Sequence, residues 1–112
     1  MSFQIKELLL ADGDSPFAEW FGALEAVAAA KVRVAISRVE QGNFSNVEWF
    51  RGIAEYKIDW GPGLRIYLAK DGLKIIILIG GGSKKRQQKD IDRAVVLWED
   101  YKRRKASTRQ GK

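Results

Sequence analysis

Histidine and cysteine are both absent from this chain of 112 residues. Without cysteine, the chain has neither a disulfide scaffold nor thiolate chemistry. Without histidine, it lacks the side chain that most often transfers protons at neutral pH and most often binds metal ions. We therefore expect no metal centre and no cofactor, and any catalysis must use lysine, arginine, tyrosine, aspartate or glutamate.

Long hydrophobic runs are also missing, because no apolar run is longer than the one at residues 75–79. A membrane-spanning helix needs about 20 predominantly apolar residues, so we expect no membrane span. The N-terminus has no basic stretch followed by an apolar stretch, and a signal peptide is therefore not expected. The sequence predicts a cytoplasmic protein that does not bind membranes.

Positive charge is in excess, with 20 Lys and Arg against 14 Asp and Glu, a net charge of +6 and a pI of about 9.7. That excess favours an anionic partner such as nucleic acid, an acidic protein or a membrane surface, without choosing among them. The composition is globular, and the length predicts one domain. We place this domain at residues 1–101, with a basic tail at residues 102–112 that we expect to fray.

The first 42 residues predict a strand followed by a helical segment. The strand covers Phe3–Leu10, and Ser15-Pro16 is typical of a helix start, with a capping serine and a proline at the first helical position. The segment is one long helix or two short ones that meet near Ala28–Ala30, and Gly42 suits its end. Its predicted buried stripe has three- and four-residue spacing: Leu24, Val27, Ala28, Val32, Ala35, Ile36 and Val39.

The central part of the chain reads as a hairpin. Residues 53–60 and 64–69 alternate apolar and polar side chains on either side of Gly61-Pro62-Gly63. Pairing Asp59 with Arg65, and Lys57 with Tyr67, keeps the apolar residues on one face, whereas a one-residue slip would mix the faces. A further short strand is predicted at Val47–Phe50.

The last part of the chain predicts one more strand and a C-terminal helix. Lys74–Ile79 is apolar on both faces, which indicates an interior strand, and we expect Gly80–Gly82 to release the chain from the sheet. The helix has a buried stripe made of Ile91, Ala94, Val95, Trp98 and Tyr101. The fold class is therefore α+β, with helices on one face of a mostly antiparallel sheet and cations on the other, partly open face.

A cluster of cations on the predicted hairpin is the candidate functional site. Lys57, Arg65 and Tyr67 share a strand face, and Lys84, Lys85 and Arg86 follow the glycines. Two neighbouring strands lie roughly 5 Å apart, so Lys57 and Arg65 could grip one phosphate. Lys57 could then take a 2′-hydroxyl proton, Arg65 could stabilise the charged transition state, and the reaction would be RNA cleavage.

Ordinary structural roles are open for the same residues. Solvent-facing lysines and arginines are common on sheets, and an Asp59–Arg65 pair could be a surface ion pair of little consequence. Glu55 could accept a proton or orient Lys57, or it could only balance neighbouring positive charge. Trp20 and Trp98 are interpreted as core residues.

The order and spacing of several motifs resemble the RelE superfamily, and in particular its HigB-like branch of phage-derived addiction module killer proteins. The resemblance runs from about Phe17 to Tyr101. The segments that carry it are Gly42-Asn43-Phe44, Glu55-Tyr56-Lys57-Ile58, the run from Gly61 to Tyr67 (GPGLRIY), Gly81-Gly82-Ser83-Lys84, Gln87 and Lys89-Asp90-Ile91.

This resemblance implies a RelE-like fold and a toxin that cleaves mRNA, usually on the ribosome. The implied partner is a small helix-turn-helix antitoxin that neutralises the toxin. Arg65 matches the arginine that holds the scissile phosphate, and Lys84 matches the lysine after the glycine run. Lys57 stands where this branch usually has arginine, and Leu64 stands where it often has tyrosine.

The expected site thus has catalytic Lys57, Arg65, Lys84 and Tyr67, and RNA-binding Lys85, Arg86, Arg103 and Arg104. Two alternatives stay open. The ParE branch shares the fold and poisons DNA gyrase, although it lacks the full basic cluster. A catalytically inactive protein that only binds its antitoxin or RNA is the second alternative, since Lys57 lacks the bidentate fork of arginine.

Overall fold

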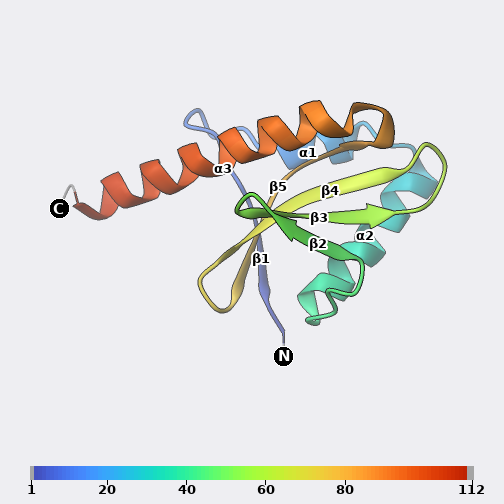
Figure 1. Cartoon of the computed structure of the whole chain (residues 1–112), viewed down its shortest axis with the longest axis horizontal. Helices are drawn as coiled ribbons and strands as arrows, with labels where there is room; N and C mark the ends of the chain where they lie inside the picture. The colour runs from blue at the N-terminus through green and yellow to red at the C-terminus, as the bar shows by residue number, and fades with distance from the viewer. Residues whose placement is uncertain (1, 111–112) are drawn as a thin grey trace.

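A five-stranded mixed sheet forms the centre of the protein (Figure 1). The computed structural model describes the backbone of residues 2–110 and the side chains of residues 2–107. The order across the sheet is β1-β5-β4-β3-β2, and every neighbouring pair is antiparallel except β1 with β5. The strands are β1 (Gln4–Glu7), β2 (Val47–Phe50), β3 (Ile53–Ile58), β4 (Leu64–Asp71) and β5 (Ile75–Ser83). The α+β class and the mostly antiparallel sheet are confirmed.

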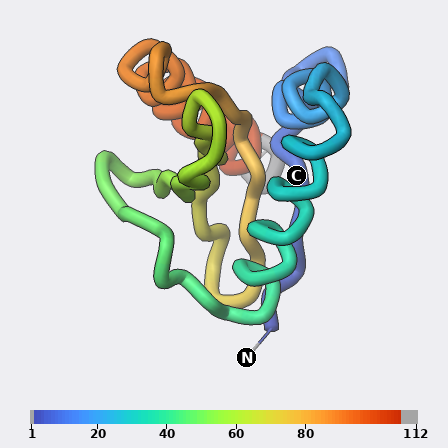
Figure 2. Tube along the Cα trace, turned by 90° about the vertical axis from the view of Figure 1, so that its right-hand side faces the viewer, coloured from blue at the N-terminus to red at the C-terminus, as the bar shows by residue number. Residues whose placement is uncertain are grey.

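Helices cover both faces of the sheet, which corrects the expectation of one open face. The helices are α1 (Pro16–Gly22), α2 (Ala26–Glu40) and α3 (Gln87–Gln110), with a short 3-10 turn η1 (Lys84–Arg86) before α3. In Figure 2, α1 and α2 lie on one side of the sheet and α3 on the other. Two separate hydrophobic cores follow from this arrangement, one under α1 and α2 and one under α3. We call these the α2 face and the α3 face.

The helical segment between residues 15 and 42 forms two helices, and this confirms the second of the two alternatives that the sequence left open. Ser15 caps α1 by accepting a hydrogen bond from the Ala18 backbone N–H at 3.0 Å, and Pro16 opens the helix as predicted. The break lies at residues 23–25 rather than in the alanine run, which is interior to α2. Val27 is also misplaced in the predicted buried stripe, because it is 53% exposed.

The hairpin register differs from the predicted one by two residues. Lys57 pairs with Arg65 and Glu55 pairs with Tyr67, so neither Asp59–Arg65 nor Lys57–Tyr67 is a pair. The loop begins after Ile58 and returns at Leu64, and the Gly63 N–H donates to the Trp60 carbonyl at 2.9 Å. A two-residue shift keeps every side chain on its own face, so the alternation alone could not distinguish the two registers.

The glycine run does not release the chain, because Gly80–Gly82 lie inside β5 and continue its pairing with β4. A register irregularity opposite Tyr67 and Leu68 marks a bulge where this extension begins. At two of these positions the side chains of Trp20 and Asp90 leave no room for a Cβ atom. A Cβ at Gly81 would overlap the Trp20 ring, and a Cβ at Gly82 would overlap the Asp90 carboxylate.

The C-terminal helix continues past Tyr101 into the predicted basic tail. α3 runs to Gln110 and is stabilised in this part by ion pairs of Arg103 and Arg104 with Asp100. Lys105 also reaches Asp71 at the end of β4. The tail residues Gly111 and Lys112 lie outside the described residues. The predicted buried stripe of α3 is confirmed, and Trp98 is 5% exposed. Within residues 2–110, no helix is both long and apolar enough to cross a membrane.

Candidate functional site

Three of the predicted cations gather at one end of the sheet. Lys57 on β3 lies directly opposite Arg65 on β4, and Arg65 lies opposite Gly82 on β5. The chain leaves β5 at Ser83, and the Lys84 N–H donates to the Gly63 carbonyl at 2.9 Å. Lys84 is thereby held beside the loop that precedes Arg65. We call Lys57, Arg65 and Lys84 the basic cluster.

Arg65 is buried against this loop rather than displayed on an open face. Its residue exposure is 8%, and its Nη1 donates to the Leu64 carbonyl at 3.2 Å. Gly63 adopts φ = 80°, and a Cβ there would lie 3.1 Å from the Lys84 Cβ and 3.4 Å from Arg65 Nη1. Only glycine suits this position, since the backbone conformation is strained for other residues and the space is already taken. The loop therefore fixes the guanidinium in place.

A buried carboxylate lies beneath the basic cluster. Glu55 is 1% exposed, and its two oxygens accept hydrogen bonds from Gln87 Nε2 at 3.0 and 2.9 Å. Arg65 Nε lies 3.8 Å from Glu55 Oε2, and Lys57 Nζ lies 4.0 Å from Glu55 Oε1. Burying a carboxylate is costly unless it is paired and hydrogen-bonded, and here both conditions are met.

The sequence suggested that Glu55 accepts a proton, orients Lys57 or only balances charge, but it gave Gln87 no role in the site. The alternation of β3 did place Glu55 on the same face as Lys57, which is the only sequence signal for its position. Gln87 begins α3 and reaches the sheet only because that helix packs on the α3 face. No local pattern around Gln87 contains that information.

Tyr67 lies in the floor of the site. It is 1% exposed, and its hydroxyl has no hydrogen-bond partner among the residues whose side chains are described. Burial is the main reason that the pKa of Tyr67 is raised far above its usual value, and the negative charge of Glu55 adds to this effect. The phenol therefore stays protonated at neutral pH, and its buried position does not fit direct contact with RNA.

Lys57 is the accessible member of the pair on the hairpin. Its side chain is 47% exposed, and its Nζ lies 3.2 Å from Glu48 Oε1 on β2. An exposed ion pair of this kind contributes at most about 1 kcal/mol, so an anionic ligand could displace Glu48. Lys57 thus combines a fixed backbone position with a head group that can move to a ligand.

The remaining predicted cations fall into two groups. Lys85 and Arg86 are exposed on η1, next to Lys84, so they extend the basic cluster. Arg103 and Arg104 lie near the other end of α3, which at 1.5 Å per residue is about 25 Å from Gln87. Arg104 pairs with Asp100 and also donates to the Leu9 carbonyl at 2.9 Å. The structure does not bring these two arginines to the site.

A cleft of about 570 Å³ adjoins the basic cluster between α1 and α3. The glycines at the end of β5 form part of its lining, which also includes Trp20 of α1 and Arg86 of η1. Asp90 also lines the cleft, and burial raises the pKa of its carboxyl group above the usual value. The cleft is thus bounded by aromatic, cationic and acidic groups. Among the described residues, no three acidic side chains converge as a metal ion would require.

The protein therefore has an α+β fold in which the basic cluster lies at one end of the sheet, next to the buried side chain of Glu55. No known family model matches the chain. It is 37% identical over 99 residues to an uncharacterized protein of Haemophilus influenzae, and the match covers 87% of this chain and 94% of that protein. The chain belongs to the same family as that protein.

Proposed function

We propose that this protein is a toxin of the RelE/HigB type, which acts in the cytoplasm as a metal-independent endoribonuclease on translated mRNA. A small helix-turn-helix antitoxin would neutralise it. The motif resemblance supports this proposal, and the mixed sheet with helices on both faces is compatible with a RelE-like fold. The observation that carries it is the direct pairing of Lys57 with Arg65, with Lys84 held beside them.

The proposed reaction is attack of a ribose 2′-oxygen on the adjacent phosphorus. Lys57, as the neutral amine, accepts the 2′-hydroxyl proton, and Arg65 stabilises the negative charge that grows on the phosphate oxygens. The bond to the 5′-oxygen breaks, and in this proposal Lys84 donates a proton to that leaving oxygen. Lys85 and Arg86 hold the RNA backbone through electrostatic contacts, which makes binding sensitive to salt.

Glu55, Gln87 and Tyr67 support this chemistry from below. Glu55 lies within 4.0 Å of Lys57 and 3.8 Å of Arg65, so its charge holds both cations on one side of the sheet. Gln87 fixes the carboxylate orientation through its two hydrogen bonds. Tyr67 is buried, so we assign it to the floor of the site instead of the catalytic role that the sequence predicted.

One observation favours a second candidate, a protein that binds RNA or its antitoxin without cleaving RNA. The two hairpin cations already have carboxylate partners, since Lys57 pairs with Glu48 and Arg65 lies beside Glu55. A paired and buried guanidinium can serve the fold alone. The two candidates differ in whether the wild-type protein cleaves RNA.

The test is controlled induction in bacteria, with protein and DNA synthesis followed separately by pulse-labelling. Wild type should stop protein synthesis within minutes. Arg65→Lys retains the charge but loses the bidentate fork, and Lys84→Ala removes an exposed amine, so both should cut RNA cleavage by about 100-fold or more. Lys74→Ala, which changes an exposed lysine in the β4–β5 turn, is the matched control and should stay toxic.

The outcomes separate the candidates. Cleaved mRNA with wild type and Lys74→Ala, but not with folded Arg65→Lys and Lys84→Ala, supports the nuclease. Loss of DNA synthesis before protein synthesis would replace it with a gyrase poison. If neither synthesis changes, the binding protein is the better interpretation. Circular dichroism of each purified variant verifies that the fold is intact.

A further inference from the structure

Helix α2 carries apolar side chains on a second face that the sheet does not cover. Its buried face is made of Ala28, Ala29, Val32, Ala35 and Val39. Val27 and Val34 are seven residues apart, so they lie one above the other on the helix, yet they are 53% and 51% exposed. A surface helix normally places polar residues on its outer side, and these two valines depart from that pattern.

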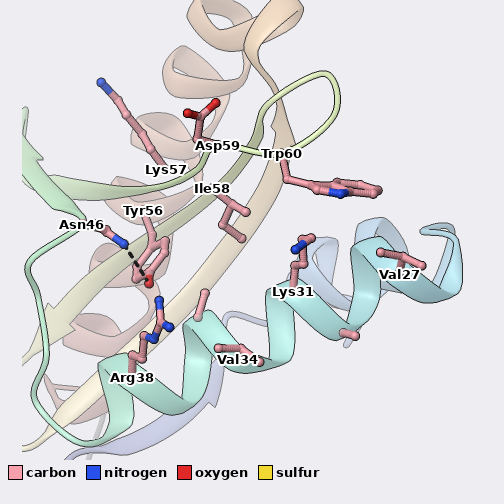
Figure 3. A pocket seen from close by; sticks show the side chains of 12 residues that line it. Val27, Lys31, Val34, Arg38, Asn46, Tyr56, Lys57, Ile58, Asp59 and Trp60 are labelled. Atoms are coloured by element: carbon pink, nitrogen blue, oxygen red, sulfur yellow. Dashed lines mark hydrogen bonds between the residues drawn. The ribbon is translucent and has the colours of Figure 1, made fainter.

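These valines form one wall of a groove of about 460 Å³ between α2 and β3. Figure 3 shows Val27 and Val34 on the helix and the Ile58 and Trp60 side chains on the opposite side. Tyr56 lies behind them, and Asn46 donates a long hydrogen bond of 3.4 Å to its hydroxyl. We call this the α2 groove. Its full lining is Val27, Ala30, Lys31, Val34, Ala35, Arg38, Asn46, Tyr56, Lys57, Ile58, Asp59 and Trp60.

The charges at the α2 groove are positive. Lys31 and Arg38 project from the helix beside the apolar wall, and Lys31 Nζ lies 5.7 Å from the centre of the Trp60 ring. Asp59 is the only acid in the lining, and Figure 3 shows its carboxylate pointing away from α2. Lys31 and Arg38 are seven residues apart, which corresponds to about 10 Å along the helix.

The sheet excludes one way of binding at this place. β3 lies between β2 and β4, so both of its edges are already paired and an extended peptide cannot add a strand there. A ligand must therefore use side chains that enter the groove. A partner helix can do this with apolar residues at i, i+3 or i+4, and i+7.

We propose that the α2 groove docks an amphipathic helix of a partner protein, with an apolar ridge between Val27 and Trp60 and acidic side chains about two turns apart that meet Lys31 and Arg38. Charge complementarity selects an acidic partner, and the exposed valines select an apolar ridge. The basic cluster is centred on the α3 face, whereas this groove lies on the α2 face, and Lys57 is the one residue that belongs to both. The docking argument uses Lys31, Arg38 and the valines of α2, none of which belongs to the basic cluster. The proposal therefore does not depend on the nuclease activity.

The test is direct binding of a labelled synthetic peptide to the full chain by fluorescence anisotropy. The peptide has about 14 residues, or four helical turns, with leucines along one side and glutamates flanking them. A matched peptide carries lysines in place of the glutamates. The acidic peptide should bind at least about tenfold more tightly than the basic one, and added salt should reduce the difference.

Two groove variants and two matched controls localise the binding. Val34→Asp and Lys31→Glu should each weaken binding by about tenfold or more. Val96→Asp changes a valine of α3 that is 64% exposed, and Lys74→Glu reverses an exposed charge far from the groove, so both should bind like wild type. All four side chains are at least partly exposed, so the fold should persist in each variant.

Several results would overturn the proposal. Equal binding of the two peptides, no binding of either, or unchanged binding by Val34→Asp would each remove the acidic helix as the occupant. A wild-type dimer in sedimentation that Val34→Asp dissociates would assign the groove to a second copy of the chain. Displacement of the peptide by a short RNA, with loss of RNA binding in Lys31→Glu, would assign it to nucleic acid.

Discussion

The two faces of the sheet bury different kinds of side chain, although the same strands supply both. On the α2 face, β4 contributes Leu64, Ile66 and Leu68 to a core of apolar residues. On the α3 face, the same strand contributes Arg65 and Tyr67, and β3 adds Glu55. A buried ion pair is weak evidence for stability, because removing two charges from water costs about as much as their attraction returns. Both faces hold a hydrophobic core, but among the described residues only the α3 face also buries charged side chains, at the end of the sheet where the basic cluster lies.

The substitution with the largest expected effect on stability is Glu55→Ala. It leaves Arg65 buried without the carboxylate beside it and removes the hydrogen-bond acceptor of Gln87. Removing one partner of a buried pair costs roughly 3–5 kcal/mol, so the free energy of unfolding in urea should fall by about that amount. The double variant Glu55→Ala, Arg65→Met should recover part of the loss, because no unpaired charge remains. If the double variant is less stable than Glu55→Ala, the pair does not account for the loss.

Ile66→Ala is the comparison change on the α2 face, and Ile66 follows Arg65 on β4. It creates a cavity in an apolar core and should cost roughly 2–5 kcal/mol. Any RNA cleavage by the folded fraction should stay at the wild-type level, unlike that of Glu55→Ala. Equal loss of cleavage in both variants would mean that the two faces are not functionally different.

A smaller effect on stability is expected for substitution of a glycine near the end of β5. Gly81→Ala would push against the Trp20 ring from α1 and should cost about 1–3 kcal/mol. Gly80→Ala is the control, because a Cβ there meets nothing within 4 Å. Thermal unfolding of the two variants measures the difference. Equal midpoints would show that α1 shifts freely and does not fix the position of the cleft.

The smallest effect is expected for Tyr67→Phe. The hydroxyl makes no hydrogen bond within 3.5 Å to the residues whose side chains are described, so removing it should change the free energy of unfolding by less than about 1 kcal/mol at neutral pH. The pKa of Tyr67 is raised in the folded state, so the protonated phenol contributes to the free energy of unfolding. This contribution is fully present below about pH 10, the usual tyrosine pKa, and is lost as the pH rises above that value. The wild type should therefore lose more stability than Tyr67→Phe between about pH 8 and pH 11. Parallel decline of both proteins would contradict the raised pKa.

Local patterns account for most of the elements that the sequence predicted. The capped start of α1 depends on Ser15 and Pro16 alone, and the buried stripe of α3 depends on helical spacing. The site was predicted only in part. Lys57, Arg65 and Lys84 come together as expected, whereas Arg103 and Arg104 lie too far away because α3 continues without a break. Gln87 meets Glu55 across 32 positions of the sequence, and no local pattern encodes such a contact.

By itself, the sequence determined which residues share a face of each strand and helix, because alternation and helical spacing follow from backbone geometry. It also determined the positive charge and the absence of histidine and cysteine chemistry. Only the tertiary structure decided that helices cover both faces, that Lys57 lies opposite Arg65, and that the glycines continue a strand. These features depend on how separate elements pack, and shifts of two residues along a strand leave the local pattern unchanged.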